Sequence, residues 1–226
     1  MARAAAIAGF KAIVATPHVM AGVFDGTPTS ITEAVSTLQA RCDESGAEIV
    51  LLPGSEVYLD ERTPSLLKGG DLVPVGRSGK YLLIELPQHD MPHYTRELLF
   101  RISLAGYTPI LAHPERNAAL RDNQAIANEL ADAGALLQLN AGSLLGVYGR
   151  RVKQAAERWL AGGLYSAIGS DWHSPSEPNS LVEVLRSRFA GIERLLAGNV
   201  RIAGDITPQG RCRDRGSGGK IRGRTL

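Results

Sequence analysis

The hydrophobic residues of this chain form short apolar runs, and stretches with helical spacing lie between them. Runs of this length, bounded by glycine, proline and polar residues, are typical of buried strands. We predict strands at residues 12–16, 48–52, 81–84, 109–112, 135–139 and 165–168. We predict helices at residues 2–8, 29–45, 64–67, 92–105, 123–133, 150–160, 182–189 and 192–196. Strands and helices that alternate in this way indicate an α/β fold with a parallel sheet or barrel.

The first long helix shows the amphipathic pattern most clearly. Ile31, Val35 and Leu38 share one side of it, so we expect all three to face the core. Thr29 or Ser30 is the expected N-cap, because a side-chain hydroxyl can accept a hydrogen bond from the first turn.

Polar or metal-capable side chains follow the predicted strands. In a parallel α/β barrel, the C-terminal ends of all strands open on one face, so residues that are remote in sequence meet there. We expect that face to collect His18, Glu56, Glu85, His113, Asn140, Asp171 and His173. Asn140 fits a turn-forming residue better than a ligand. On one rim, three carboxylates repel one another and three imidazoles lose their hydration. Divalent cations that bind both kinds of group would offset these costs.

A mixed set of nitrogen and oxygen ligands of this size suits more than one ion of the Mn, Fe or Zn type. Phosphate-ester hydrolysis is the reaction that such a site serves best, because the ions lower the pKa of a bound water and neutralise phosphoryl oxygens. A cysteine nucleophile is disfavoured, because Cys42 lies in a predicted helix away from the strand ends.

Composition separates a domain from a tail. The 226 residues, 44% of them hydrophobic, fit one domain, which we place at residues 1–207. Residues 210–226 contain six of the 25 Lys and Arg residues and one acidic residue, so the rest of the chain carries 19 basic and 22 acidic side chains. The sequence pI of 8.6 therefore gives no reason to expect a nucleic-acid-binding domain. We expect the Gly/Arg-rich tail at 208–226 to be disordered, whether it is a non-native end or an RNA- or membrane-surface-binding segment.

Two cysteines do not make a disulfide framework and fit a reducing cytoplasm. The alanine-rich start is too short to span a bilayer, so we expect no membrane insertion.

Five motifs together resemble one known superfamily. They are Thr16-Pro17-His18, Gly54-Ser55-Glu56, Leu83-Ile84-Glu85-Leu86, Ala112-His113-Pro114-Glu115-Arg116 and Ser170-Asp171-Trp172-His173. In this order and at these intervals they resemble the PHP (polymerase and histidinol phosphatase) superfamily. Within it they are most similar to the bacterial CpsB-like protein-tyrosine phosphatases of capsule and exopolysaccharide operons. Each motif alone is weak, but five in order over residues 1–205 are specific.

The resemblance implies a distorted seven-stranded (β/α) barrel of the TIM-like type with a manganese-supporting site of two or three ions. The implied substrate is phosphotyrosine on a cognate bacterial tyrosine autokinase. Carried over by position, the implied metal ligands are His18, Glu56, Glu85, His113, Asp171 and His173. Arg116 is implied to bind the phosphoryl group and, with His113, to be catalytic. We expect His89 and His93 to lie on a loop at the rim, where they could contact substrate.

The sequence also departs from the family pattern. Relatives begin with a strand that carries a His-x-His pair and an acidic loop, and this sequence starts after both, so we expect one barrel strand and about three ligands to be missing. Such a gap would leave an unpaired strand edge. Residues 174–178 also lack the arginine that relatives often carry for substrate phosphate. Two other functions stay open: a small-molecule phosphatase of the histidinol-phosphate type, and a catalytically impaired remnant that only binds a partner.

Overall fold

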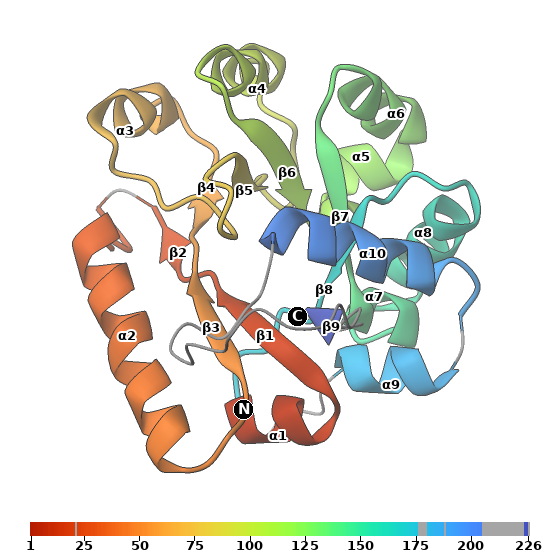
Figure 1. Ribbon diagram of the computed structural model, residues 1–226. Coiled ribbons are helices and arrows are strands. Elements are labelled where there is room, and N and C mark those ends of the chain that lie inside the picture. Colours follow the sequence, from red (N-terminus) through yellow and green to blue (C-terminus); the bar gives the residue numbers. More distant parts are fainter. Residues whose placement is uncertain (21, 176–179, 188, 205–223, 226) are drawn as a thin grey trace, which may run out of the picture.

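The computed structural model describes residues 1–20, 22–175, 180–187, 189–204 and 224–225 (Figure 1). All six predicted strands are present, and the fold is α/β with parallel sheets, as the alternating pattern indicates. These strands are β1 (Phe10–Ala15), β3 (Val50–Pro53), β5 (Tyr81–Glu85), β6 (Thr108–Ala112), β7 (Leu136–Asn140) and β8 (Ala167–Gly169). Three short strands were not predicted, namely β2 (His18–Val19), β4 (Glu56–Tyr58) and β9 (Arg224–Thr225).

The described strands form two parallel sheets. The larger sheet has the order β2-β4-β5-β6-β7-β8, and the smaller one has the order β3-β1-β9. In the larger sheet the spatial order of the strands follows their order in the sequence, and every strand pair is parallel. Among the described residues, β8 pairs with neither β1 nor β2, so this part of the sheet stays open at that point.

The two sheets are connected because two strands change sheet. β1 continues beyond Pro17 as β2, and β3 continues beyond Gly54 as β4. The first strands end before His18 and Glu56, close to the predicted ends at residues 16 and 52, but each of these two residues then begins a short strand that was not predicted. Pro17 has no N–H to donate to a ladder, and a Cβ on Gly54 would lie 2.9 Å from a Val75 methyl group. Pro17 therefore interrupts the first ladder, and close packing at residue 54 requires glycine between β3 and β4.

The strand residues are buried on both sides, which explains their uninterrupted apolar runs. Leu82 and Ile84 of β5 belong to the main core, which lies between the sheet and the outer helices. Leu83, between them, packs with Ile110 and Ile202 in a second cluster on the opposite side of the strands. In Figure 1 helices α2, α3, α4, α6 and α8 lie around the outside of the strands.

The helices mostly match the predicted ranges. They are α1 (Ala2–Ile7), α2 (Pro28–Glu44), α3 (Thr63–Gly69), α4 (Thr95–Leu104), α5 (Ala118–Asp122), α6 (Gln124–Asp132), α7 (Ala141–Leu145), α8 (Arg150–Ala161), α9 (Ser180–Ser187) and α10 (Ile192–Ala203). The short helices α5 and α7, together with a 3₁₀ turn at Pro114–Arg116, were not predicted. Each is too short to show a helical repeat of apolar residues.

Two details of α2 correct the sequence analysis. The N-cap is Thr27, whose hydroxyl accepts from the Ser30 N–H at 3.1 Å while Ser30 Oγ accepts from the Thr27 N–H at 3.0 Å. Pro28 then occupies the first helical position, where its missing N–H costs nothing. Ile31 and Val35 are buried as predicted, but Leu38 is 47% exposed, so the prediction that it faces the core is wrong.

The open edge of β8 is covered by α10. Oδ1 of Asn199 accepts a hydrogen bond from the Ile168 N–H at 3.0 Å, and Nδ2 donates to the Ile168 carbonyl at 2.7 Å. This side-chain amide thus replaces the backbone of a neighbouring strand. The helix can come this close because residue 198 is glycine: a Cβ there would lie 1.8 Å from the Ser166 carbonyl oxygen.

The outer edge of β1 is paired with β9. The register aligns Phe10 with Arg224 and Ala12 with Thr225, in parallel. Arg224–Thr225 is the only part of the predicted tail 208–226 that the structure describes. The prediction that the tail is disordered otherwise falls on residues outside the description and stays untested. In the described residues, no helix is long and apolar enough to cross a membrane.

Removing the Asn199 amide should destabilise the fold. Asn199→Ala leaves the buried Ile168 N–H and carbonyl without partners, so we expect the free energy of unfolding to fall by about 2–4 kcal/mol. Urea unfolding followed by circular dichroism measures this loss. The control is Asn128→Ala, at an exposed position of α6, which should change stability by less than about 0.5 kcal/mol. Equal stability of the two variants would show that the amide does not support the strand edge.

Candidate metal and phosphate site

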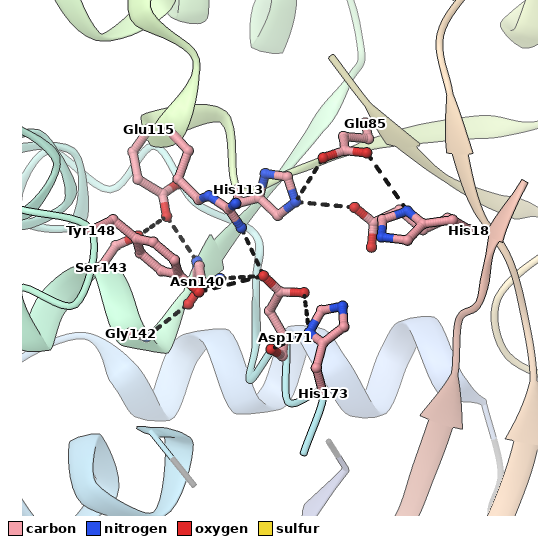
Figure 2. A network of polar contacts seen from close by, with 12 residues as sticks. His18, Glu85, His113, Glu115, Asn140, Gly142, Ser143, Tyr148, Asp171 and His173 are labelled. Atoms are coloured by element: carbon pink, nitrogen blue, oxygen red, sulfur yellow. Dashed lines mark hydrogen bonds and ion pairs between the residues drawn. The ribbon is translucent and has the colours of Figure 1, made fainter. Parts of the chain in front are cut away.

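Four side chains from neighbouring strands meet at one point of the rim. They are His18, Glu56, Glu85 and His113 (Figure 2), here called the His/Glu cluster. His113 Nε2 lies 3.0 Å from Glu56 Oε1 and 3.7 Å from Glu85 Oε1. His18 Nδ1 lies 3.6 Å from Glu85 Oε2. One potential ligand atom from each of His18, Glu56 and Glu85 falls within 4.8 Å of the others.

Strand register and backbone geometry place these residues together. His18 lies directly opposite Glu56 in the β2–β4 pair, and Glu85 lies opposite Tyr58, two residues beyond Glu56. Side chains two residues apart on a strand point to the same face, so Glu56 and Glu85 share one side. His113 directly follows β6 and has a φ of 32°.

The charges of the His/Glu cluster are strongly coupled. Burial, followed by the nearby charge of Glu56, raises the pKa of Glu85. Burial opposes protonation of His113, but the hydrogen bond and charge of Glu56 outweigh it and raise the pKa of His113. Two carboxylates at this spacing need positive charge between them. Two imidazoles and two carboxylates that converge on one space also form the mixed donor set that suits Mn, Fe or Zn. The residues present therefore fit a divalent metal ion.

A second group of side chains surrounds Asp171, here called the Asp171 cluster. Arg116 Nη1 donates to Asp171 Oδ2 at 2.7 Å, and Asn140 Nδ2 donates to the same oxygen at 3.0 Å (Figure 2). The Tyr148 hydroxyl lies 3.5 Å from this oxygen, and the Arg116 guanidinium carbon lies 4.3 Å above the centre of the Tyr148 ring. Arg116 is thus fixed by an ion pair on one side and an aromatic face on the other.

A buried carboxylate lies beneath the Asp171 cluster. Glu115 is fully buried, and its Oε1 accepts from the Ser143 hydroxyl at 2.7 Å and from the Asn140 N–H at 3.0 Å. Its Oε2 accepts from the Tyr165 hydroxyl at 3.0 Å. Burial raises the pKa of Glu115, and the bonds from Ser143 and Asn140 partly offset this. Burial, reinforced by Glu115, raises the pKa of Tyr165 well above its ordinary value.

The other predicted site residues differ in their relation to the His/Glu cluster. His173 is exposed and lies beside Asp171, with its ring stacked 6.2 Å from that of His18. The structure therefore divides the six predicted ligands between the His/Glu cluster and the neighbouring Asp171 and His173. His89 and His93 are exposed on the loop after β5, and their role at the site stays a prediction. That loop is tied to the rim, because Asn117 Nδ2 donates to the carbonyls of Pro87 and Asp90.

Sequence reasoning gave no role to several residues of the site. Glu115 stood inside the His-Pro-Glu-Arg motif, and its position beside His113 was the available signal. Tyr148 and Ser143 had no sequence signal, since they lie in the unpredicted α7 and the turn after it. Asn140 is a turn former, as expected: its Oδ1 caps α7 by accepting from the Gly142 N–H at 2.8 Å. Its Nδ2 has a second role, because it also holds Asp171.

Backbone strain is concentrated at these two clusters. Among the described residues, His113 and Asp171 are the two non-glycine residues with positive φ, 32° and 49°. Such a conformation costs on the order of 1–3 kcal/mol per residue and persists only where surrounding contacts enforce it. The strain turns both side chains away from the strand direction and toward the rim. This concentration of strain is typical of functional sites.

Neutralising Glu115 should destabilise the buried hydrogen-bond network beneath the Asp171 cluster. Glu115→Gln presents one amide oxygen to three donors and turns an NH₂ group toward one of them, so we expect a loss of about 2–4 kcal/mol in the free energy of unfolding. The control is Glu129→Gln, which breaks an exposed ion pair with Arg96 and should cost less than about 1 kcal/mol. Urea unfolding of both variants measures the difference. A Glu115 variant as stable as the control would mean that its three hydrogen bonds contribute nothing net.

Known proteins resemble this chain in sequence and in structure. The family described as "Capsular polysaccharide synthesis, CpsB/CapC" matches residues 1–184. The tyrosine-protein phosphatase YwqE of Bacillus subtilis (strain 168) is 34% identical over 179 residues, which are 79% of this chain and 70% of the relative. The tyrosine-protein phosphatase CpsB of Streptococcus pneumoniae is 28% identical over 171 residues, 74% of this chain and 70% of the relative.

One solved structure has the same fold over most of its length. It comes from a study of YwqE from Bacillus subtilis and CpsB from Streptococcus pneumoniae, described as "unique metal-dependent tyrosine phosphatases". The TM-score is 0.80 at 30% identity, and the match covers 90% of this chain and 84% of the other. The chain described here therefore belongs to the CpsB/CapC family.

Proposed function

We propose that this chain is a metal-dependent phosphatase that hydrolyses phosphotyrosine in proteins. The observation that carries the proposal is the His/Glu cluster, in which four side chains with metal-ligand chemistry converge from separate strands beside a fixed arginine. Family membership supports the reaction, because the similar relatives are named tyrosine-protein phosphatases. The enzyme class is that of the phosphoric monoester hydrolases.

His18, Glu56, Glu85 and His113 are the residues that would hold the metal, with Asp171 and His173 as further ligands from the neighbouring loop. When bound, ions of this type supply a water of lowered pKa and positive charge for the phosphoryl oxygens. Imidazole and carboxylate donors together suit Mn, Fe or Zn, and of these we favour manganese because the family resemblance implies it. Stimulation of metal-free protein by each cation in turn identifies which one the site uses.

Arg116 would bind the phosphoryl group of the substrate. Its planar guanidinium matches the geometry of phosphoryl oxygens, and the Asp171 carboxylate and Tyr148 ring restrict its orientation before substrate arrives. A cation fixed in advance stabilises charge in the transition state without reorganisation. His89 and His93, on the adjacent loop, would contact the polypeptide around the phosphotyrosine. A cysteine nucleophile is not needed, and Cys42 lies in α2.

The proposed protein substrate is a tyrosine kinase of a capsule or exopolysaccharide system in the cytoplasm. Its support is the family description, which refers to capsular polysaccharide synthesis. We also interpret the two sheets as parts of one distorted barrel of the TIM-like (β/α) type. This interpretation is supported by parallel strands whose spatial order follows the sequence and by helices on the outside (Figure 1).

Two substitutions should separate metal binding from phosphoryl binding. His113→Ala removes a proposed ligand, so we expect at least about a 100-fold loss of activity and a lower metal content. Arg116→Ala should reduce kcat by about 100-fold or more while metal content stays close to wild type. Hydrolysis of p-nitrophenyl phosphate in manganese gives the activity, and elemental analysis gives the metal content.

The matched control is Arg101→Ala, at an exposed position of α4, which should alter neither activity nor metal content. If Arg116→Ala loses metal as completely as His113→Ala, the division of roles is wrong. A wild-type protein that retains fewer than about two ions and turns over no substrate would instead favour the non-catalytic alternative.

A further inference from the structure

A short hairpin turn follows β2 and carries an exposed aromatic residue. Met20 and Phe24 form an isolated antiparallel bridge: the Met20 N–H donates to the Phe24 carbonyl at 3.1 Å, and the Phe24 N–H donates to the Met20 carbonyl at 2.8 Å. The Gly22 N–H donates to Asp25 Oδ1 at 2.7 Å. The backbone of Phe24 is thus held at both polar groups, which restrains the position from which its side chain extends.

The Phe24 ring lies beside the His/Glu cluster. Its centroid is 5.7 Å from that of His18, with 32° between the two planes. The His18 ring is also stacked with that of His173, at 6.2 Å with 27° between planes. His18 therefore contacts two other rings. Its side chain is 35% exposed, against 15% for Glu85 and 7% for Glu56, so these ring contacts lie closer to solvent than the carboxylates do.

Phe24 is far more exposed than packing alone would require. It is 52% exposed, and its neighbour Val23 is 60% exposed. Burial of apolar surface stabilises a protein by about 25 cal/mol per Å², and exposed apolar side chains lack this stabilisation. Two adjacent apolar side chains that are exposed on a hydrogen-bonded turn, next to a cluster of polar ligands, are typical of a binding surface.

We propose that Phe24 is a specificity-determining residue that packs against the aromatic ring of the substrate phosphotyrosine. This inference rests on the proposed phosphatase function of the His/Glu cluster. The ester oxygen of phosphotyrosine is bonded directly to the ring, so a phosphoryl group at the cluster brings the ring to the solvent side of His18, where Phe24 lies. Aromatic pairs at centroid distances of 4.5–7 Å contribute about 0.5–1.5 kcal/mol beyond area burial. Phosphoserine has no ring to place there, so Phe24 favours aryl over alkyl phosphates.

Two inhibitors separate the ring from the phosphoryl-like group. Phenylphosphonate has an aromatic ring and a phosphonate group, whereas methylphosphonate has the phosphonate group alone. Neither compound can be hydrolysed. The manganese-loaded full chain is assayed with phenyl phosphate, and inhibition constants are measured for wild type, Phe24→Ala and Phe24→Tyr. The matched control is Phe100→Ala, which removes an exposed phenylalanine from the solvent side of α4. Manganese content and thermal unfolding are measured for each variant.

Phe24→Ala should raise the inhibition constant of phenylphosphonate by about 3- to 10-fold, the equivalent of a lost aromatic pair. The constant for methylphosphonate should change by less than about 2-fold. Phe24→Tyr, which keeps the ring, and Phe100→Ala should both match wild type. An equal loss for both inhibitors would overturn the inference, because Phe24 would then act through the metal cluster. Unchanged constants would overturn it as well.

These outcomes differ from a failure of the proposed function. If wild type binds manganese but does not hydrolyse phenyl phosphate, the phosphatase proposal fails. Direct calorimetric binding of phenylphosphonate and methylphosphonate to wild type and Phe24→Ala then replaces the kinetic assay. The role of Phe24 as a ring-binding residue requires the same selective loss in that measurement.

Discussion

The close approach of Glu56 and Glu85 is the constraint on which the site depends. Two carboxylates held this near each other repel, and burial makes the repulsion stronger because little water is present to screen it. His113, with its Nε2 3.0 Å from Glu56, supplies the nearest partner. Such a group is costly for folding alone and becomes favourable when a cation is bound. The fold therefore holds two repelling carboxylates together at the rim, an arrangement that fits a divalent ion.

The surrounding structure is arranged to keep these side chains in place. Positive φ angles at His113 and Asp171 turn both side chains into the rim, and each costs free energy that neighbouring contacts must offset. The Glu115 network supplies such contacts, since it ties the turn after β6 to the N-terminus of α7 and to Tyr165. The same network holds Asn140, which in turn holds Asp171. The Glu115 network thus supports both the turn that carries His113 and the Asp171 cluster.

Two strand edges, those of β8 and β1, find hydrogen-bond partners without a further long strand. On β8, the Asn199 amide provides one donor and one acceptor to Ile168, and Gly198 lets the helix come within reach. On β1, the short strand β9 pairs with the outer edge. Both devices satisfy backbone groups that would otherwise be buried or exposed without partners.

The sequence by itself determined the alternation of strands and helices, because apolar runs and helical spacing are local properties. It also placed His18, Glu56, Glu85 and His113 after such runs, and parallel pairing then requires that they meet. Local pattern could not show that the strands at His18 and Glu56 continue into a second sheet, nor that Thr27 caps α2. It could not find Tyr148, Ser143 or the edge-capping Asn199. Those roles exist only where segments distant in sequence come into contact, so tertiary structure alone decided them.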